Sequence, residues 1–150
     1  MNKSKLIDVQ QAMANVAVVL NEVPGLLETT VFGPDIVTSP PTVVRRTRDY
    51  EMWYWADKFG NHQALRSMTS ISGRLAALTG GNNPYPDGPL GVIQAGAYAD
   101  VLLVDGNPLE DISVLGASDD MFGAPDRDMG EIPTMRLIMK GGVIYKNTLN

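Results

Sequence analysis

The sequence predicts an α/β protein in which helices and one strand come first and a β-rich tail follows. Three observations predict this class. Apolar residues recur at helical spacing in the first half of the chain, whereas short β-branched runs bounded by glycine fill the second half. A segment rich in Asn, Pro and Gly over residues 82–89 separates the two regions, so we expect a division into residues 1–81 and 82–150.

Composition limits the chemistry. The 150 residues include no cysteine, which excludes disulfides, thiol nucleophiles and thiolate zinc sites. The excess of 17 acidic over 12 basic residues disfavours non-specific nucleic-acid binding, which needs surplus positive charge. No apolar run reaches the ~18 residues of a membrane span. The basic start lacks a signal-peptide core behind it, so the cytoplasm is the default location.

The first helix is expected over residues 6–23, because apolar positions there alternate at spacings of three and four. Pro24 and Gly25 end it. We expect the apolar face to pack on something larger. The face consists of Leu6, Val9, Met13, Val16, Leu20 and Val23.

Residues 26–32 are apolar and β-branched, which predicts a buried strand, and Gly33-Pro34-Asp35 predicts a tight loop directly after it. In parallel α/β barrels, active-site residues gather at that end of the strands. An aspartate that caps a turn is the ordinary alternative, and the pattern alone leaves both interpretations of Asp35 open.

The second helix is expected from Thr42, as its cap, to about Phe59. It carries an arginine cluster followed by an aromatic group. In an acidic chain this cluster indicates surface pairing or packing more than a nucleic-acid patch. The arginines are Arg45, Arg46 and Arg48, and the aromatic residues are Tyr50, Trp53, Tyr54 and Trp55.

A third helix is expected over residues 61–78, capped by Asn61 and closed by Gly80 and Gly81. Its first turn holds His62, the single histidine of the chain. A catalytic histidine needs a third group that orients it, and a lone histidine in a first helical turn most often faces solvent. One histidine also excludes a histidine-rich metal site within this sequence.

The tail predicts strands over residues 90–93 and 99–104 and a hairpin that pairs residues 135–139 with 143–145. Gly141 and Gly142 supply the tight turn of that hairpin. Residues 105–131 contain eight acidic residues and one basic residue. Such a charge run is typical of a solvated excursion, and we assign it no mechanism.

Residues 90–112 resemble the C-terminal signature of the amidohydrolase superfamily, in its imidazolonepropionase-like and Xaa-Pro dipeptidase-like branch. Residues 139–147 resemble the hairpin that ends those chains. Residues 64–69 are similar to the last barrel helix of the family, and residues 32–35 to its eighth strand and following aspartate. The resemblance therefore covers nearly the whole chain.

This resemblance implies a fold. Residues 1–81 would form the terminal helix-strand-helix-helix portion of a (β/α)₈ TIM-like barrel, and residues 82–150 part of a small β-sandwich that ends in the hairpin. Gly91, Gly96 and Gly106 would permit the turns between short strands. Because a complete barrel takes ~250 residues, we expect the chain to be a C-terminal fragment of such an enzyme.

The resemblance implies one site residue. Asp35 matches the aspartate that binds metal and carries the proton from the metal-activated water to the leaving amine. Pro34 departs from the threonine or serine usual in the family, and His62 matches none of the family's metal-binding histidines. Asp35 would therefore bind the divalent, zinc-like metal only together with an N-terminal portion, and no cofactor is expected in this chain alone.

Two functions follow. The chain is expected to be the C-terminal part of a metal-dependent amidohydrolase that acts on amide, dipeptide or cyclic amide C–N bonds and is inactive by itself. The alternative is a non-catalytic, self-associating module in which Asp35 is a turn residue. Exposed strand edges would pair with a second copy or with the N-terminal portion, and neither nucleic acid nor membrane is an expected partner.

Overall fold

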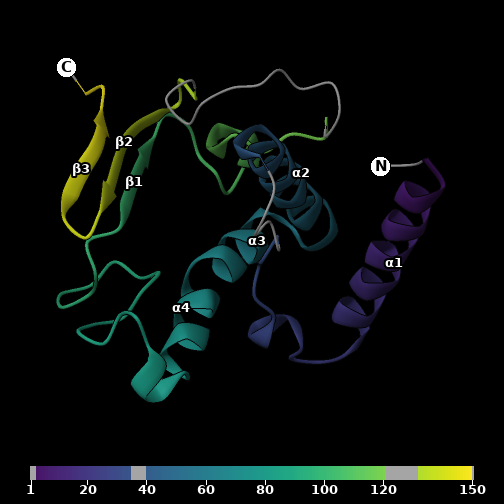
Figure 1. Ribbon diagram of the computed structural model, residues 1–150, viewed down its shortest axis with the longest axis horizontal. Helices are drawn as coiled ribbons and strands as arrows, with labels where there is room; N and C mark the ends of the chain where they lie inside the picture. Colours follow the sequence, from purple (N-terminus) through teal and green to yellow (C-terminus); the bar gives the residue numbers. More distant parts are fainter. Residues whose placement is uncertain (1–2, 35–39, 121–131, 150) are drawn as a thin grey trace.

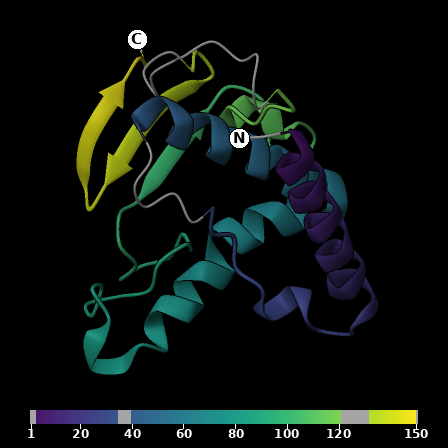
Figure 2. The same ribbon diagram turned by 45° about the vertical axis from the view of Figure 1, so that its right-hand side comes forward.

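The computed structural model describes residues 3–34, 40–120 and 132–149 as a mixture of helices and one small antiparallel sheet. The long helices come first, and the sheet and α1 lie at opposite sides of the remaining helices (Figures 1 and 2). Within the described residues, no helix combines the length and apolar character needed to cross a membrane. The helices are α1 (Lys3–Glu22), α2 (Pro41–Phe59), α3 (Asn61–Met68) and α4 (Ser70–Ala77).

Helix α1 confirms the first predicted helix but buries only part of its expected face. Ala17 and Leu20 are buried, and the helix packs on α2. Val16 and Val23, which belong to the predicted apolar face, are 55% and 45% exposed. The buried part of α1 is therefore narrower than its predicted apolar face.

The prediction of a strand over residues 26–32 is wrong. Leu27–Thr29 form a 3₁₀ helix, η1, in which the amides of Glu28, Thr29 and Thr30 donate back to carbonyls three residues earlier. Residues 30–34 have no strand pairing, because no other described strand lies beside them. The one described backbone bond from Phe32 joins its amide to the Ser67 carbonyl. The barrel portion of the predicted fold therefore stays a prediction.

The second helix is confirmed, with Pro41 rather than Thr42 at its start, since proline fits the first helical turn. The third helix is divided into α3 and α4 at Thr69, whose φ of −120° and ψ of −93° interrupt the helical backbone. The prediction that Asn61 caps this helix is wrong. Asn61 is the first helical residue, and its side chain donates instead to the Leu109 carbonyl.

The sheet has the order β1–β2–β3, with each neighbouring pair antiparallel. Its strands are β1 (Val101–Val104), β2 (Met135–Lys140) and β3 (Val143–Asn147). The predicted hairpin is confirmed, because Gly141 and Gly142 have φ values of 55° and 79°, which suit a tight type I′ turn.

The strand expected over residues 90–93 is not formed. The segment bends at Gly91, whose φ is 69°, and the loop behind it closes where the Tyr98 amide donates to the Pro89 carbonyl. Gly91 lies against α4, so that an added Cβ would lie 2.3 Å from the backbone of Thr69. Residues 90–93 therefore pack on the start of α4 and do not pair in a sheet.

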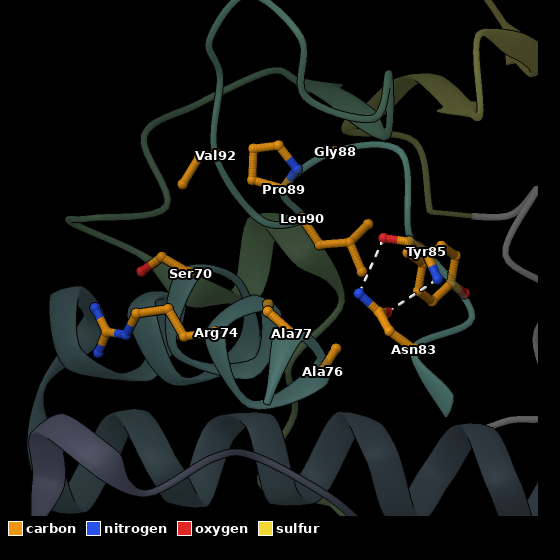
Figure 3. A pocket seen from close by; sticks show the side chains of 11 residues that line it. Ser70, Arg74, Ala76, Ala77, Asn83, Tyr85, Gly88, Pro89, Leu90 and Val92 are labelled. Atoms are coloured by element: carbon orange, nitrogen blue, oxygen red, sulfur yellow. Dashed lines mark hydrogen bonds between the residues drawn. The ribbon is translucent and has the colours of Figure 1, made fainter. Parts of the chain in front are cut away.

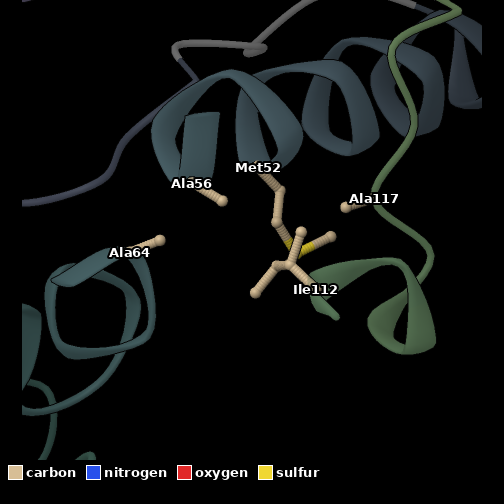
Figure 4. Close-up of a cluster of buried hydrophobic side chains, with 5 residues drawn as sticks. All are labelled: Met52, Ala56, Ala64, Ile112 and Ala117. Atoms are coloured by element: carbon tan, nitrogen blue, oxygen red, sulfur yellow. The ribbon is translucent and has the colours of Figure 1, made fainter. Parts of the chain in front are cut away.

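The main hydrophobic cluster joins the helices to the tail (Figure 4). Met52 reaches from α2 to Ile112, which begins the short 3₁₀ helix η3 (Ile112–Leu115). The expectation of a solvated excursion over residues 105–131 is therefore wrong for this part, and residues 121–131 lie outside the described residues. The sequence pattern did not predict the packing of η3 on α2, because η3 is too short to show periodicity. The buried members are Met52, Ala56, Ala64, Ile112 and Ala117.

Candidate functional site

Asp35, the predicted catalytic residue and metal ligand, lies outside the described residues. The described segment that leads to it is fixed where α2 and α3 meet. The Phe32 ring packs edge-on against Trp55, with ring centroids 6.0 Å apart, and the Phe32 amide donates to the Ser67 carbonyl over 3.3 Å. These contacts hold the described residues before position 35 against α2 and α3.

Side chains of α3 and α4 hold η1, just before this segment. Gln63 Nε2 donates to the Leu27 carbonyl over 2.8 Å. Arg66 binds the carboxylate of Glu28 through both terminal nitrogens, one of them at 2.9 Å from Oε1. Arg74 Nη2 donates to the Glu28 backbone carbonyl over 2.9 Å. Two arginines therefore converge on one residue of the turn.

The charges of this cluster stabilise each other. The hydrogen bond from Arg66 is the main cause that lowers the pKa of Glu28, and the positive charge of Arg74 adds to it. The same bond raises the pKa of Arg66. Because both groups keep their charge and remain open to solvent, the arrangement is suited to anchoring η1 rather than to proton transfer.

His62 is exposed in the first turn of α3, as the sequence predicted. In the part of the chain that the structure describes, no three His, Asp or Glu side chains gather closely enough to hold a metal ion. These residues alone therefore do not fit a divalent metal centre, which needs at least three protein ligands.

A cavity of about 190 Å³ lies between α4 and the loop of residues 83–92 (Figure 3). Asn83, at one end, uses its side chain to bind the backbone of Tyr85, and the Arg74 guanidinium extends away from Leu90 and Ala77. The lining offers no acid–base pair. It is mostly apolar, with a volume that suits a single small apolar group. It consists of Ser70, Gly73, Arg74, Ala76, Ala77, Asn83, Tyr85, Gly88, Pro89, Leu90 and Val92.

The arginine and aromatic residues of α2 serve packing and pairing, which was the predicted interpretation. Arg48 donates from Nε to the carboxylate of buried Asp49 over 2.9 Å. Tyr50 and Tyr54 stack at 6.3 Å, and Lys58 lies over the Tyr54 ring. Burial is the main cause that raises the pKa of Tyr54.

Sequence reasoning missed the cluster of Glu28, Arg66 and Arg74. The partners are 38 and 46 residues apart, so no local spacing could have predicted it. Only the fold of η1 against α3 and α4 brings these charges together.

No protein-family model and no curated protein matches the chain. Several solved structures are similar to part of it, among them two crystal structures. The crystal structure of an uncharacterized protein is 30% identical over 67% of this chain, with a TM-score of 0.47. The crystal structure of a prolidase complexed with N-methylphosphonate-L-proline is 28% identical over 68%, with a TM-score of 0.46. The chain spans about a fifth of the length of each of these proteins (20% and 21%).

Proposed function

We propose that the chain is the C-terminal part of a metal-dependent amidohydrolase that acts on C–N bonds of amide, dipeptide or cyclic amide substrates. The resemblance of residues 90–112 to the family signature is the basis of the proposal. One structural observation supports it. Gly91, Gly96 and Gly106 all have positive φ, at 69°, 83° and 100°, as turns between short segments require.

Two of these glycines, Gly91 and Gly106, also permit close packing. An added Cβ at Gly91 would lie 2.3 Å from the Thr69 backbone, and one at Gly106 would lie 2.9 Å from the Val114 side chain. The signature therefore has a structural purpose, namely to attach the tail to α4 and η3. The signature is the reason for the proposed family, and we propose no chemical role for its own residues.

Asp35 is the one residue of this chain that we propose for the reaction, as metal ligand and proton carrier. The described residues do not by themselves provide a metal centre. A divalent, zinc-like ion would therefore need further ligands from an N-terminal portion that carries the family's histidines. By itself the chain is proposed to bind no cofactor and to be inactive.

The first experiment examines the DNA upstream of this gene. A reading frame that encodes His-X-His in an amidohydrolase-like context supports the proposal, and an unrelated upstream region contradicts it. Where such a frame exists, co-expression with this chain should give stoichiometric zinc and hydrolysis of Xaa-Pro dipeptides. Asp35→Ala should abolish that activity, and the matched control His62→Ala should retain it.

The isolated chain provides the complementary measurement. After incubation with zinc and removal of unbound ions, elemental analysis should find no stoichiometric metal, because one carboxylate is too weak a site. Hydrolysis should stay at background and be unchanged by Asp35→Ala. Turnover that this substitution removes would show that the chain is an active enzyme.

The second candidate function is a non-catalytic, self-associating module. Exposed apolar side chains on α1 and on the sheet favour it, because apolar area that solvent reaches is removed from water when two copies associate. Sedimentation at micromolar to millimolar concentration tests it, and a chain that remains monomeric throughout contradicts it. The residues are Ile7, Val16, Val18, Val19 and Val23 on α1, and Leu102, Leu103, Val143, Ile144 and Tyr145 on the sheet.

A further inference from the structure

Helix α1 exposes a line of apolar residues along one of its sides. Val16, Val19 and Val23 are 55%, 51% and 45% exposed. Val23 directly follows α1 and continues its last turn, because its amide donates to the Val19 carbonyl over 3.0 Å. Spacings of four, three and four residues place all members on one side of the helix. We call this line the valine stripe, and it consists of Ala12, Val16, Val19 and Val23.

The neighbouring line of α1 residues, displaced by one position, is mostly polar. Gln11 Nε2 donates to Asn15 Oδ1 over 3.1 Å, so these two side chains satisfy each other. Val18 is 53% exposed, nearly as much as Val16, but its neighbours along the line are polar. A single exposed valine is ordinary, whereas a continuous apolar line at helical spacing is typical of a helix that packs on a partner. The line consists of Gln11, Asn15, Val18 and Glu22.

We propose that two copies of the chain associate by packing α1 on α1 along the valine stripe. Apolar residues that alternate at three and four positions are the pattern with which two helices interlock their side chains, and β-branched residues are common at these positions in helix pairs. In the sequence, Val9 continues the same spacing toward the N-terminus. The stripe therefore fits a helix that carries the same spacing, and a second copy of α1 is such a helix.

Charge and position both allow two copies to meet at this surface. The chain has a net charge of −5, so two copies repel each other overall. Residues 9–21 contain no charged residue, so contact along the stripe brings no like charges together. Both views place α1 at the periphery of the described residues, on the side away from the sheet (Figures 1 and 2). A second copy can therefore approach α1 without displacing the sheet.

The interface is small. Between residues 12 and 23 a helix rises about 17 Å, and packing along this length buries less than the roughly 1,200 Å² of a standard stable interface. We therefore expect a dimer that dissociates on dilution. This inference specifies the surface for the self-association proposed above and rests on that proposal, but it is independent of the hydrolase proposal.

Val16 and Val18 provide matched variants, because they are the same residue type at nearly equal exposure on the same helix. Val16→Lys places a charge where the second copy would remove it from water, and sedimentation should show dimerisation weakened roughly tenfold or more. Val18→Lys adds the same charge outside the stripe and should leave dimerisation unchanged. Circular dichroism checks that both variants keep the helical content of the unmodified chain.

Cysteine cross-linking tests the same surface without adding charge, because the chain has no cysteine of its own. Val16 lies near the middle of the stripe, so its two copies are close in a parallel and in an antiparallel pair, whose helix axes would be about 8–10 Å apart. Val18 lies about 200° around the helix from Val16, so its two copies point away from each other. A short bismaleimide should therefore join Val16→Cys into a covalent dimer and leave Val18→Cys monomeric.

The outcomes separate this inference from the proposals above. If the chain associates but Val18→Lys weakens association as much as Val16→Lys, or Val18→Cys cross-links as readily as Val16→Cys, self-association stands and the stripe is the wrong surface. If the chain stays monomeric at every concentration, both the stripe interface and the self-association proposal fail. If Val16→Lys weakens only a complex with a co-expressed N-terminal portion, the stripe binds that portion, and the second copy is the wrong occupant.

Discussion

Ile112 and Ile144 carry the same side chain and lie in the same tail of the chain, but their surroundings are opposite. Ile112 is 6% exposed and packs between η3 and α2 in the main hydrophobic cluster. Ile144 is 51% exposed on β3. Apolar residues of the tail therefore serve two different purposes: some attach the tail to the helices, and others remain on an open edge.

The difference follows from how each segment is held. The Ser113 amide donates to the Asp111 side chain over 2.9 Å at the start of η3, and the Ser118 amide donates to the Asp49 carbonyl of α2 over 3.1 Å. These bonds hold Ile112 against Met52. Strand β3 is hydrogen-bonded to β2 alone among the described strands, and the Ile144 side chain stays half exposed.

Substituting each isoleucine by alanine tests this comparison with the largest expected change in the free energy of unfolding. Ile112→Ala should lower the free energy of unfolding by about 2–5 kcal/mol, because it removes buried methyl groups and leaves a cavity. Ile144→Ala should lower it by less than about 1 kcal/mol, since its side chain is half exposed. Urea unfolding measures both. Equal losses would mean that the sheet buries Ile144 as well as the cluster buries Ile112.

A pair of glycines tests how tightly the connection between the two regions is packed. Gly91 and Gly96 both have positive φ, so substituting either by alanine should cost roughly 1–2 kcal/mol because the backbone there is left-handed. Gly91→Ala should cost a further 1–3 kcal/mol or so, because its Cβ would meet the Thr69 backbone. Gly96→Ala has nothing within 4 Å and provides the control. Indistinguishable unfolding midpoints would contradict the close packing of the loop on α4.

The smallest effect concerns η1, which is held by charge rather than by burial. Arg66 lowers the pKa of Glu28, so this pair stabilises the fold above the unfolded pKa, near 4.5, and the contribution is lost as pH falls through the lower folded value. Glu28→Gln should therefore flatten the decline in stability on acidification. Thermal unfolding between pH 3 and pH 7 measures this, with Glu22→Gln, at the end of α1, as the charge-matched control. A steeper acid decline in Glu28→Gln would refute it.

Much of the candidate site was beyond sequence reasoning. The sequence singled out Asp35 through a resemblance, and that residue lies outside the described residues. The strand predicted before it failed, because β-branched residues form a strand only where a neighbouring strand offers hydrogen bonds. The anchoring of η1 by Arg66 and Arg74 could not be predicted, since the partners are far apart in the chain.

The sequence by itself determined the features that depend on a few neighbouring residues. These are the helices α1 and α2, whose apolar spacing and terminal Pro and Gly are local, and the β2–β3 hairpin, which Gly141 and Gly142 direct. Only the tertiary structure decided which apolar residues are buried. Ile112 and Ile144 are the same residue type, and the burial of each depends on the segment that packs over it.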